Sequence, residues 1–222
     1  MRSYRIKDTN KNIKLGIGFP CSYEFVPFNF FQSMMFMKKP DYEFIAAKHG
    51  NVDVMRNYMV REARQAECTH LIMLDTDMVY HEDTIFKLLS YNLPIVGALC
   101  FRRGEPFNPL MLKGEPGNYQ CIDEWTEDEL VEVDATGTGC ILFDMEVFRK
   151  MPSPWFKFKI QKNGKPLGED IGFCHELRKA GYTIYVDTSI PTKHLTTMEI
   201  TRETYILYKA LRARQDRKKM QG

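Results

Sequence analysis

The run Thr69 to Leu74 (THLIML) most constrains how this chain can fold, because it has the length of a strand and is apolar almost throughout. Such runs are typical of strands that are buried on both faces at the centre of a parallel sheet. Other apolar runs of strand length alternate along the chain with segments of helical periodicity, which is the pattern of an α/β domain. We therefore expect an α/β fold in which this run forms a central strand.

The predicted elements follow one another in the order that such a fold requires. In the first half we expect strands at 13–19, 42–46, 69–74 and 95–101, and helices at 28–38, 51–67 and 81–91. In the second half we expect short strands at 110–113, 119–122, just before Gly137, at 140–144 and at 183–186, with helices at 170–180 and 202–219. At roughly 150 residues per domain, a chain of 222 residues forms one domain with a small appendage.

Composition and cysteine usage narrow the class of protein further. Apolar residues make up 44% and charged residues 27% of the chain, which excludes a disordered or fibrous protein. No apolar run approaches the roughly 18 residues that a membrane-spanning helix needs, and the basic N-terminal residues lack the apolar stretch of a secretory signal. The six cysteines form no CxxC pair, so we expect free thiols rather than disulfides or a zinc site. These features predict a cytoplasmic protein without a membrane span.

Two carboxylates, Asp75 and Asp77, directly follow the central run. Residues i and i+2 of an extended backbone project to the same face, so both side chains can share one divalent cation. Ligands of α/β proteins also bind beyond the carboxyl ends of the strands. Without a cation or hydrogen bonds, the two carboxylates would repel each other and pay a desolvation penalty. The motif favours a metal site, with solvated turn aspartates as the alternative.

Three further features could carry chemistry. Glu169 and Asp170 open a predicted helix, where a carboxylate is an ordinary helix cap or, near an acceptor hydroxyl, a general base. His194 follows a short strand, and an imidazole beside two carboxylates suits Mn²⁺ or a similar ion. In the segment 134–139, Gly137 would let the backbone approach a bound sugar or phosphate closely, and a tight strand connection is the alternative.

Together these motifs resemble those of the GT-A glycosyltransferases, particularly family 2-like members of the short type found in phages and bacteria. The resemblance runs from about residue 14 to residue 195. It is carried by a first strand that ends at Pro20, a helix with Arg56-Asn57, the segments LIMLDTDM, DATGTGCILF and GEDIGFCHELRKAGY, and His194.

The resemblance implies a GT-A type fold, a Rossmann-like mixed sheet flanked by helices. It implies a single catalytic domain over residues 1–201. Residues 14–101 would form the nucleotide- and metal-binding half and residues 102–201 the acceptor half, with a basic C-terminal helix or tail over residues 202–222.

The resemblance also implies roles for individual residues. The nucleotide-sugar donor would contact Pro20, Arg56, Asn57, Asp75 and Gly137. Asp75, Asp77 and His194 would hold Mn²⁺ or Mg²⁺ against the donor diphosphate. Asp170 matches the catalytic base of inverting members, with Glu169 beside it. The acidic residue that usually follows the first strand and contacts uracil has only Glu24 as a loose counterpart.

The implied function is metal-dependent transfer of a sugar, by analogy from a UDP-sugar, to an acceptor hydroxyl. Residues 202–222 carry seven basic and two acidic residues, a net charge of +5, which is enough for a phosphate footprint and favours a hydroxymethylated DNA base as the acceptor. A cell-surface precursor and a protein remain open as acceptors.

Two other functions stay open at this point. A nucleotidyltransferase would usually need a phosphate loop rich in Gly, Arg and Lys after the first strand, and the segment GFPCSYEF lacks one. A nucleic-acid-binding module could instead be built on the basic tail. There are two ordinary structural alternatives for the tail: it is a solvated terminal helix, or Tyr205, Leu207, Tyr208 and Leu211 pack that helix on the body.

Overall fold

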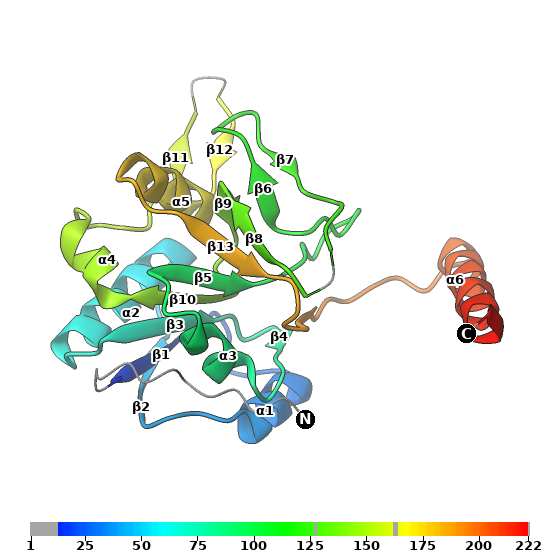
Figure 1. Ribbon diagram of the computed structural model, residues 1–222, viewed down its shortest axis with the longest axis horizontal. Helices are drawn as coiled ribbons and strands as arrows, with labels where there is room; N and C mark the ends of the chain where they lie inside the picture. Colours follow the sequence, from blue (N-terminus) through cyan, green and yellow to red (C-terminus); the bar gives the residue numbers. More distant parts are fainter. Residues whose placement is uncertain (1–12, 127, 162–163, 222) are drawn as a thin grey trace.

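A seven-stranded mixed sheet organises the computed structural model, which describes residues 13–126, 128–161 and 164–221 (Figure 1). Its strands are β1 (Leu15–Pro20), β2 (Tyr42–Ala47), β3 (His70–Leu74), β5 (Ile95–Ala98), β8 (Leu130–Val133), β10 (Cys140–Asp144) and β13 (Ile184–Asp187). They lie in the order β2-β1-β3-β10-β5-β13-β8. Strands from both predicted halves of the domain therefore share one sheet.

Helices cover both faces of this sheet. Helices α1 (Phe28–Phe36) and α3 (Thr84–Ser90) pack on one face, and α2 (Val52–Gln65), α4 (Met145–Lys150) and α5 (Glu169–Lys179) pack on the other. In β1, Leu15 and Ile17 are fully buried toward α1 and α3. Gly18, which follows Ile17, faces α2, and a Cβ added there would lie only 2.8 Å from the Sδ atom of Met59. The small residues of β1 thus let α2 lie close against the sheet.

The strand directions bring several chain ends to one edge of the sheet. Strands β2, β1 and β3 are parallel, whereas β10 runs antiparallel between β3 and β5. Strand β13 is parallel to β5, and β8 is antiparallel to β13. The carboxyl ends of β1 and β3 therefore lie beside the start of β10, where polar segments from distant parts of the chain meet.

Shorter strand pairs complete the body. Strands β6 (Met111–Lys113), β7 (Gln120–Cys121) and β9 (Ala135–Thr136) form a small sheet, and β11 (Lys159–Ile160) pairs with β12 (Pro166–Leu167). Strand β4 (Met78–Val79) pairs with β14 (Lys193–His194), and this pairing places His194 opposite Met78, just after the two aspartates.

The mixed α/β architecture expected from the sequence is confirmed, as a mixed sheet flanked by helices. The predicted helices and strands are present to within a few residues at their ends. The six cysteines are free thiols, as expected. The two-residue strands β7 and β9 match the strands expected at 119–122 and just before Gly137. Helix α4 and the strands β4, β11, β12 and β14 were not predicted, because segments of two to six residues are too short to display a periodicity.

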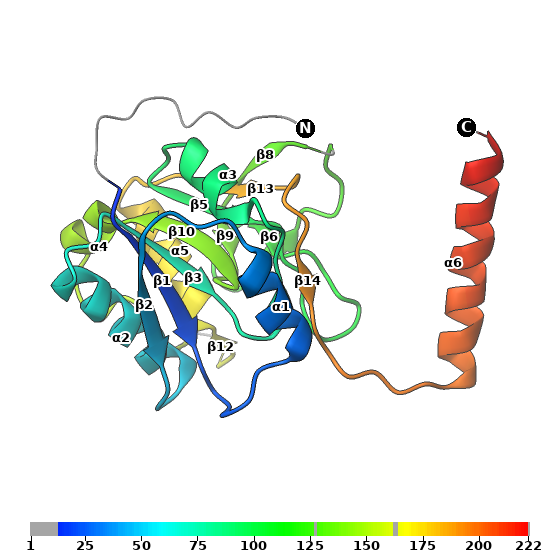
Figure 2. The same cartoon turned by 90° about the horizontal axis from the view of Figure 1, so that it is seen from below.

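Helix α6 (Arg202–Gln221) stands apart from the body, at the end of the exposed segment 196–201 (Figures 1 and 2). The alternative in which this helix packs on the body is therefore wrong. Its side chains Tyr205, Leu207, Tyr208 and Leu211 are 44–62% exposed. Within the described ranges, no helix combines the length and the apolar character needed to cross a membrane. The basic N-terminal residues 1–12 of the predicted domain lie outside the described residues.

Candidate functional site

A cavity of about 620 Å³ opens at the carboxyl edge of β1 and β3. Six of the residues that line it are predicted site residues, namely Pro20, Arg56, Asp75, Asp77, Glu169 and Asp170. The remaining lining residues are Ser22, Tyr23, Phe25, Val26, Pro27, Val52, Thr76 and Arg103. Segments that are far apart in the sequence therefore converge on one cavity, which we take as the candidate site.

The turn that carries the two aspartates is tied to the start of β10. The backbone N–H of Asp75 donates to the carbonyl oxygen of Gly139 over 3.0 Å. The buried hydroxyl of Tyr80 lies 2.7 Å from the carbonyl oxygens of both Asp75 and Gly139. A Cβ at Gly139 would lie 2.7 Å from the Sδ atom of Met78 and 3.2 Å from Oδ2 of Asp75, so a larger residue would displace these side chains. The role of Tyr80 in holding this turn was not predicted from the sequence. Its position close after the two aspartates was the available signal, because a buried tyrosine hydroxyl needs a hydrogen-bond partner.

A buried arginine organises the carboxylates of the cavity. Arg56 is only 5% exposed, and its guanidinium forms ion pairs with Glu169 and, over 3.4 Å, with Oδ1 of Asp75. Glu169 is buried as well, at 4% exposure. Buried charges are retained only when they are paired, so Arg56 and Glu169 each depend on the other for stability. The charge of Glu169 is therefore engaged within the protein.

Asp170 differs from Glu169 in its environment. Burial raises the pKa of the Asp170 carboxyl, the charge of Arg56 and the backbone N–H of Ile171 lower it, the charge of Asp75 raises it, and the net pKa lies above the usual value. The Ile171 N–H donates to Oδ1 of Asp170 over 2.7 Å. A carboxyl with a raised pKa that lines a cavity has the properties of a general base or acid.

Gly137, whose backbone was expected to contact a bound sugar or phosphate, lies next to the carboxylate of Asp170. A Cβ added there would be 3.7 Å from Oδ2 of Asp170 and 2.8 Å from a side-chain carbon of Leu110. Gly137 is buried and does not line the cavity itself, so its small size makes room for Asp170 and Leu110.

Asp77, which lines the cavity, faces His194, which is not among the lining residues. The Nε2 atom of His194 lies 3.4 Å from Oδ1 of Asp77, and the Nδ1–H of His194 donates to the carbonyl oxygen of Phe101 over 2.7 Å. Burial alone would raise the pKa of Asp77, but the hydrogen bond and charge of His194 and the charge of Arg103 outweigh it and lower the pKa. Burial would lower the pKa of His194, but its hydrogen bonds to Asp77 and Phe101 raise the pKa above the usual value.

The Asp77 carboxylate and Nε2 of His194 could bind a divalent cation whose remaining ligands come from water and the substrate. With Nδ1–H held by a backbone carbonyl, Nε2 of His194 is the ring nitrogen left to bind a metal, which is the usual arrangement of a metal-ligating histidine. Three or more His, Cys, Asp or Glu side chains do not gather into a metal group anywhere in the described ranges. Mg²⁺ and similar ions commonly take one or two carboxylates and fill the other positions with water and substrate phosphates.

Asn57 does not line the cavity, so the nucleotide contact that the resemblance implied for it is not supported. Its side chain is buried, accepting from the N–H groups of Trp155 (2.8 Å) and Phe156 (3.2 Å) and donating to the carbonyl oxygens of Phe156 (2.7 Å) and Asp53 (2.8 Å). Successive residues of an α-helix point in directions about 100° apart, so Arg56 can face the cavity while Asn57 faces the chain at 155–156.

The loop after β1 supplies aromatic rather than acidic contacts. Glu24 is exposed and does not line the cavity, whereas its neighbours Tyr23 and Phe25 do, at 79% and 84% exposure. Arg103, which ion-pairs with Oδ2 of Asp77 over 2.8 Å, is a further lining residue that sequence reasoning missed. The sequence signal that could have identified Tyr23 and Phe25 as lining residues is the presence of aromatic residues in the loop after the first strand.

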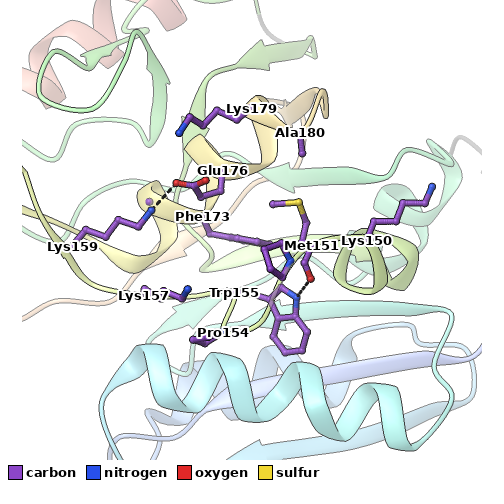
Figure 3. Close-up of a pocket in the computed structure, with 12 residues that line it drawn as sticks. Lys150, Met151, Pro154, Trp155, Lys157, Lys159, Phe173, Glu176, Lys179 and Ala180 are labelled. Atoms are coloured by element: carbon purple, nitrogen blue, oxygen red, sulfur yellow. Dashed lines mark hydrogen bonds and ion pairs between the residues drawn. The ribbon is translucent and has the colours of Figure 1, made fainter.

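A second cavity, of about 450 Å³, lies between α4 and α5 (Figure 3). In Figure 3 the side chain of Lys159 points toward Glu176, and the two form an ion pair at 2.6 Å. The ring of Trp155 is held by a hydrogen bond from Nε1 to the carbonyl oxygen of Met151 at 3.0 Å. None of the predicted site residues lines this cavity, so it is separate from the candidate site.

Comparison with known proteins finds a structure with a similar fold but identifies no family. No protein-family model matches the chain, and no curated protein matches it. Among solved structures, the chain is similar to A197 from STIV, with a TM-score of 0.55 and 17% sequence identity over 84% of this chain and 87% of that one. At this identity the similarity shows a shared overall fold alone.

Proposed function

We propose that the protein is a metal-dependent glycosyltransferase, which moves a sugar from a nucleotide-diphosphate sugar, a UDP-sugar by analogy, to an acceptor hydroxyl. The observation that carries the proposal is the cavity at the carboxyl edge of β1 and β3. There Asp77, which pairs with His194, lines the same cavity as the half-buried Asp170 and the exposed aromatic residues Tyr23 and Phe25. These are the three kinds of group that the reaction needs, for the diphosphate, the acceptor proton and the nucleoside.

Donor binding would use the outer part of the cavity. Tyr23 and Phe25 offer exposed aromatic faces on which a nucleobase can stack, and Pro20 lines the same cavity. The guanidinium of Arg103, which is already at the mouth, can contact a diphosphate oxygen.

Asp77 and His194 would hold Mn²⁺ or Mg²⁺, with Asp75 beside them. When bound, such an ion neutralises the charge of the departing diphosphate as a Lewis acid. The ion pair between Arg56 and Asp75 keeps the Asp75 carboxylate within the cavity, where it can also contact the donor ribose.

Asp170 would accept the proton of the acceptor hydroxyl. A base on the acceptor side, opposite the departing diphosphate, corresponds to an inverting reaction. Glu169, which was expected to share this role, is engaged by Arg56, so we assign it the positioning of Arg56 rather than proton transfer. The raised pKa of Asp170 suits a base, because a more basic carboxylate removes a hydroxyl proton more readily.

A hydroxymethylated base of DNA is the acceptor that we propose. Helix α6 carries seven basic residues against the two acidic residues Glu203 and Asp216, and a basic helix of this kind can contact phosphates. A cytoplasmic location accords with the six free thiols. Nucleotidyl transfer has less support, because residues 21–27, after β1, include no Gly, Lys or Arg.

A screen of nucleotide sugars tests the proposal. The full-length protein is incubated with each sugar in Mn²⁺ or Mg²⁺, and release of the nucleoside diphosphate is measured. We expect hydrolysis of one donor that requires the metal and is lost in Asp77→Ala. The matched control is Asp123→Ala, which removes an exposed carboxylate outside the cavity and should retain wild-type hydrolysis. Absence of metal-dependent hydrolysis of every donor, or equal hydrolysis by Asp77→Ala, contradicts glycosyl transfer at this site.

A further inference from the structure

Positive charge is concentrated in residues 147–168. This part of the sequence contains six basic residues and no acidic one, namely Arg149, Lys150, Lys157, Lys159, Lys162 and Lys165. Of the 31 basic and 29 acidic residues of the chain, residues 202–222 hold seven and two, so the rest of the chain is acidic overall. A concentration of basic residues on an acidic body is a candidate surface for an anionic partner.

Three of these lysines line the second cavity, which lies between α4 and α5 (Figure 3). They are Lys150, Lys157 and Lys159, and Lys179 of α5 lines it as well. Among the described residues that line this cavity, Glu176 is the one carboxylate, and it is engaged by the ion pair with Lys159. The cavity therefore has an excess of positive charge.

The charges of Lys150, Lys157 and Lys179 are available to a ligand. All three residues are exposed, and within the described ranges none of them forms an ion pair with a carboxylate. Lys150 and Lys179 lie in the last turns of α4 and α5, where the helix dipole favours a cation. That dipole is equivalent to only about half an elementary charge, so it offsets the charge of each lysine only in part.

Arg64 extends the basic surface to α2. Its guanidinium lies 5.7 Å from the centroid of the Trp155 ring, and Trp155 lines the second cavity. Arg64 is exposed and lies in the last turn of α2. Basic side chains from α2, α4, α5 and β11 thus border one hollow in the surface.

These cations are spread out rather than gathered at one point. Figure 3 shows Lys150 at one end of the cavity and Lys157 and Lys159 at the other. A further cavity of about 450 Å³ shares Lys159 and Glu176 with the second cavity and continues to His175, and we call the two adjoining cavities the basic groove. A small anion needs converging donors, whereas a nucleic acid carries charges at intervals along its backbone. The spread of the lysines therefore favours a phosphate backbone.

We propose that the basic groove binds the phosphate backbone of duplex DNA. Gly172 of α5 lines the groove, and it follows by two residues Asp170, which lines the candidate site. DNA in the groove would therefore lie beside the helix that carries the proposed base. Enzymes that act on a base of a duplex extrude the nucleotide into their site, which requires that the flanking backbone is held. The choice of DNA among polyanions rests on the proposed function.

Fluorescence anisotropy of the full chain with a short labelled duplex, at several salt concentrations, tests the groove. The variant Lys150→Gln, Lys157→Gln, Lys179→Gln removes three charges and keeps the ion pair of Lys159 with Glu176. We expect the affinity at low salt to fall at least about tenfold. The slope of log affinity against log salt should flatten by up to about 2.7, at roughly 0.9 for each phosphate contact that is lost.

The matched control is the variant Lys14→Gln, Lys38→Gln, Lys113→Gln. It makes the same change in net charge at lysines that do not line the groove and that already pair with carboxylates. We expect its affinity for DNA to stay within about threefold of the wild type. A loss as large as that of the groove variant would show an effect of net charge alone and would overturn the proposal.

Acetylation of lysines, measured for each residue by mass spectrometry, locates the contact on the wild-type protein. Duplex DNA should protect Lys150, Lys157 and Lys179 and leave Lys14 and Lys38 as reactive as before. Equal reactivity of the three groove lysines with and without bound DNA would overturn the proposal.

Three further results would also overturn it. The wild type could fail to bind duplex DNA at low salt, or the groove variant could bind as the wild type does, which would leave α6 as the DNA contact. Vesicles of phosphatidylcholine and phosphatidylserine could bind the wild type and not the groove variant while DNA binding is unchanged, which would assign the groove to a lipid surface. Metal-dependent hydrolysis of the donor is measured separately, so failure of the groove and failure of sugar transfer are distinguishable.

Discussion

The Nε2 atom of His194 lies 3.4 Å from Oδ1 of Asp77, although the two residues are far apart in the sequence. The other nitrogen of His194 is held by the carbonyl oxygen of Phe101, which leaves Nε2 directed at the carboxylate. The Asp77 oxygen lies in the cavity, and we propose that a cation and a diphosphate would meet beside these two donor atoms.

We therefore expect UDP and Mn²⁺ to bind with positive coupling. Calorimetric titration of UDP into the full-length protein should give an affinity that is at least about tenfold higher with Mn²⁺ than without it, and this gain should vanish in Asp77→Ala and in His194→Ala. The exposed-site variant Asp123→Ala should retain the gain. Equal UDP affinity with and without Mn²⁺ in the wild type would remove the metal from the proposed mechanism.

Replacement of Asp170 by Asn should abolish transfer and spare donor binding. Asn keeps an oxygen that can accept from the Ile171 N–H, so the local structure should survive while the base is lost. Because a positioned base typically contributes 10²–10⁴-fold, we expect the transfer rate to fall by about that factor while UDP affinity stays within about twofold. Transfer that remains within about tenfold of the wild type would place the base elsewhere.

The raised pKa of Asp170 also predicts a pH dependence. A general base works only when it is ionised, so the rate should increase as the pH rises through the pKa of this carboxyl. Since burial places that pKa above the usual aspartate value, the acid limb of the profile of kcat should lie at higher pH than for an exposed aspartate. Rates measured across the acidic range test this, and an acid limb at the ordinary value would contradict the assignment.

Substitution of Asn57 should act on stability rather than on the site. Asn57→Ala removes the partners of the N–H groups of Trp155 and Phe156 and of the Phe156 carbonyl, all of them buried. We expect the free energy of unfolding to fall by about 2–4 kcal/mol, and Tm by about 5–15 °C, with UDP affinity of the folded protein unchanged. Thermal denaturation measures this, with the exposed Asn118→Ala as control. A stable variant that loses UDP binding would restore Asn57 to the nucleotide contacts.

Binding of duplex DNA should depend on the basic residues of α6. The triple change Lys209→Gln, Arg212→Gln and Arg214→Gln removes three charges and spares the apolar residues of the helix. We expect log affinity to fall with log salt in the wild type. The slope should flatten by up to about 2.7 in the variant, at roughly 0.9 for each phosphate that the helix no longer neutralises. Fluorescence anisotropy at several salt concentrations measures both slopes. Absence of DNA binding by the wild type at low salt would exclude DNA as the acceptor.

The sequence by itself determined the elements and their faces. The apolar run before Asp75 marked β3, and the spacing of Met55, Met59 and Ala63 marked the buried face of α2, because both patterns depend only on neighbours in the chain. The rule that ligands bind beyond the carboxyl ends of strands placed Asp75 and Asp77 at an edge of the sheet. Asp75 and Asp77 line the cavity because they directly follow β3.

Only the tertiary structure decided what each polar side chain contacts. Arg56 and Asn57 are adjacent and both polar, yet Asn57 is hydrogen-bonded to the chain at 155–156 and Arg56 pairs with Glu169. Pairing of β14 with β4 brought His194 to Asp77, and the separation of α6 from the body left Leu207 exposed. Periodicity reports which face of an element is apolar, but partners across the sequence are chosen by strand pairing and packing. Those depend on the whole chain at once.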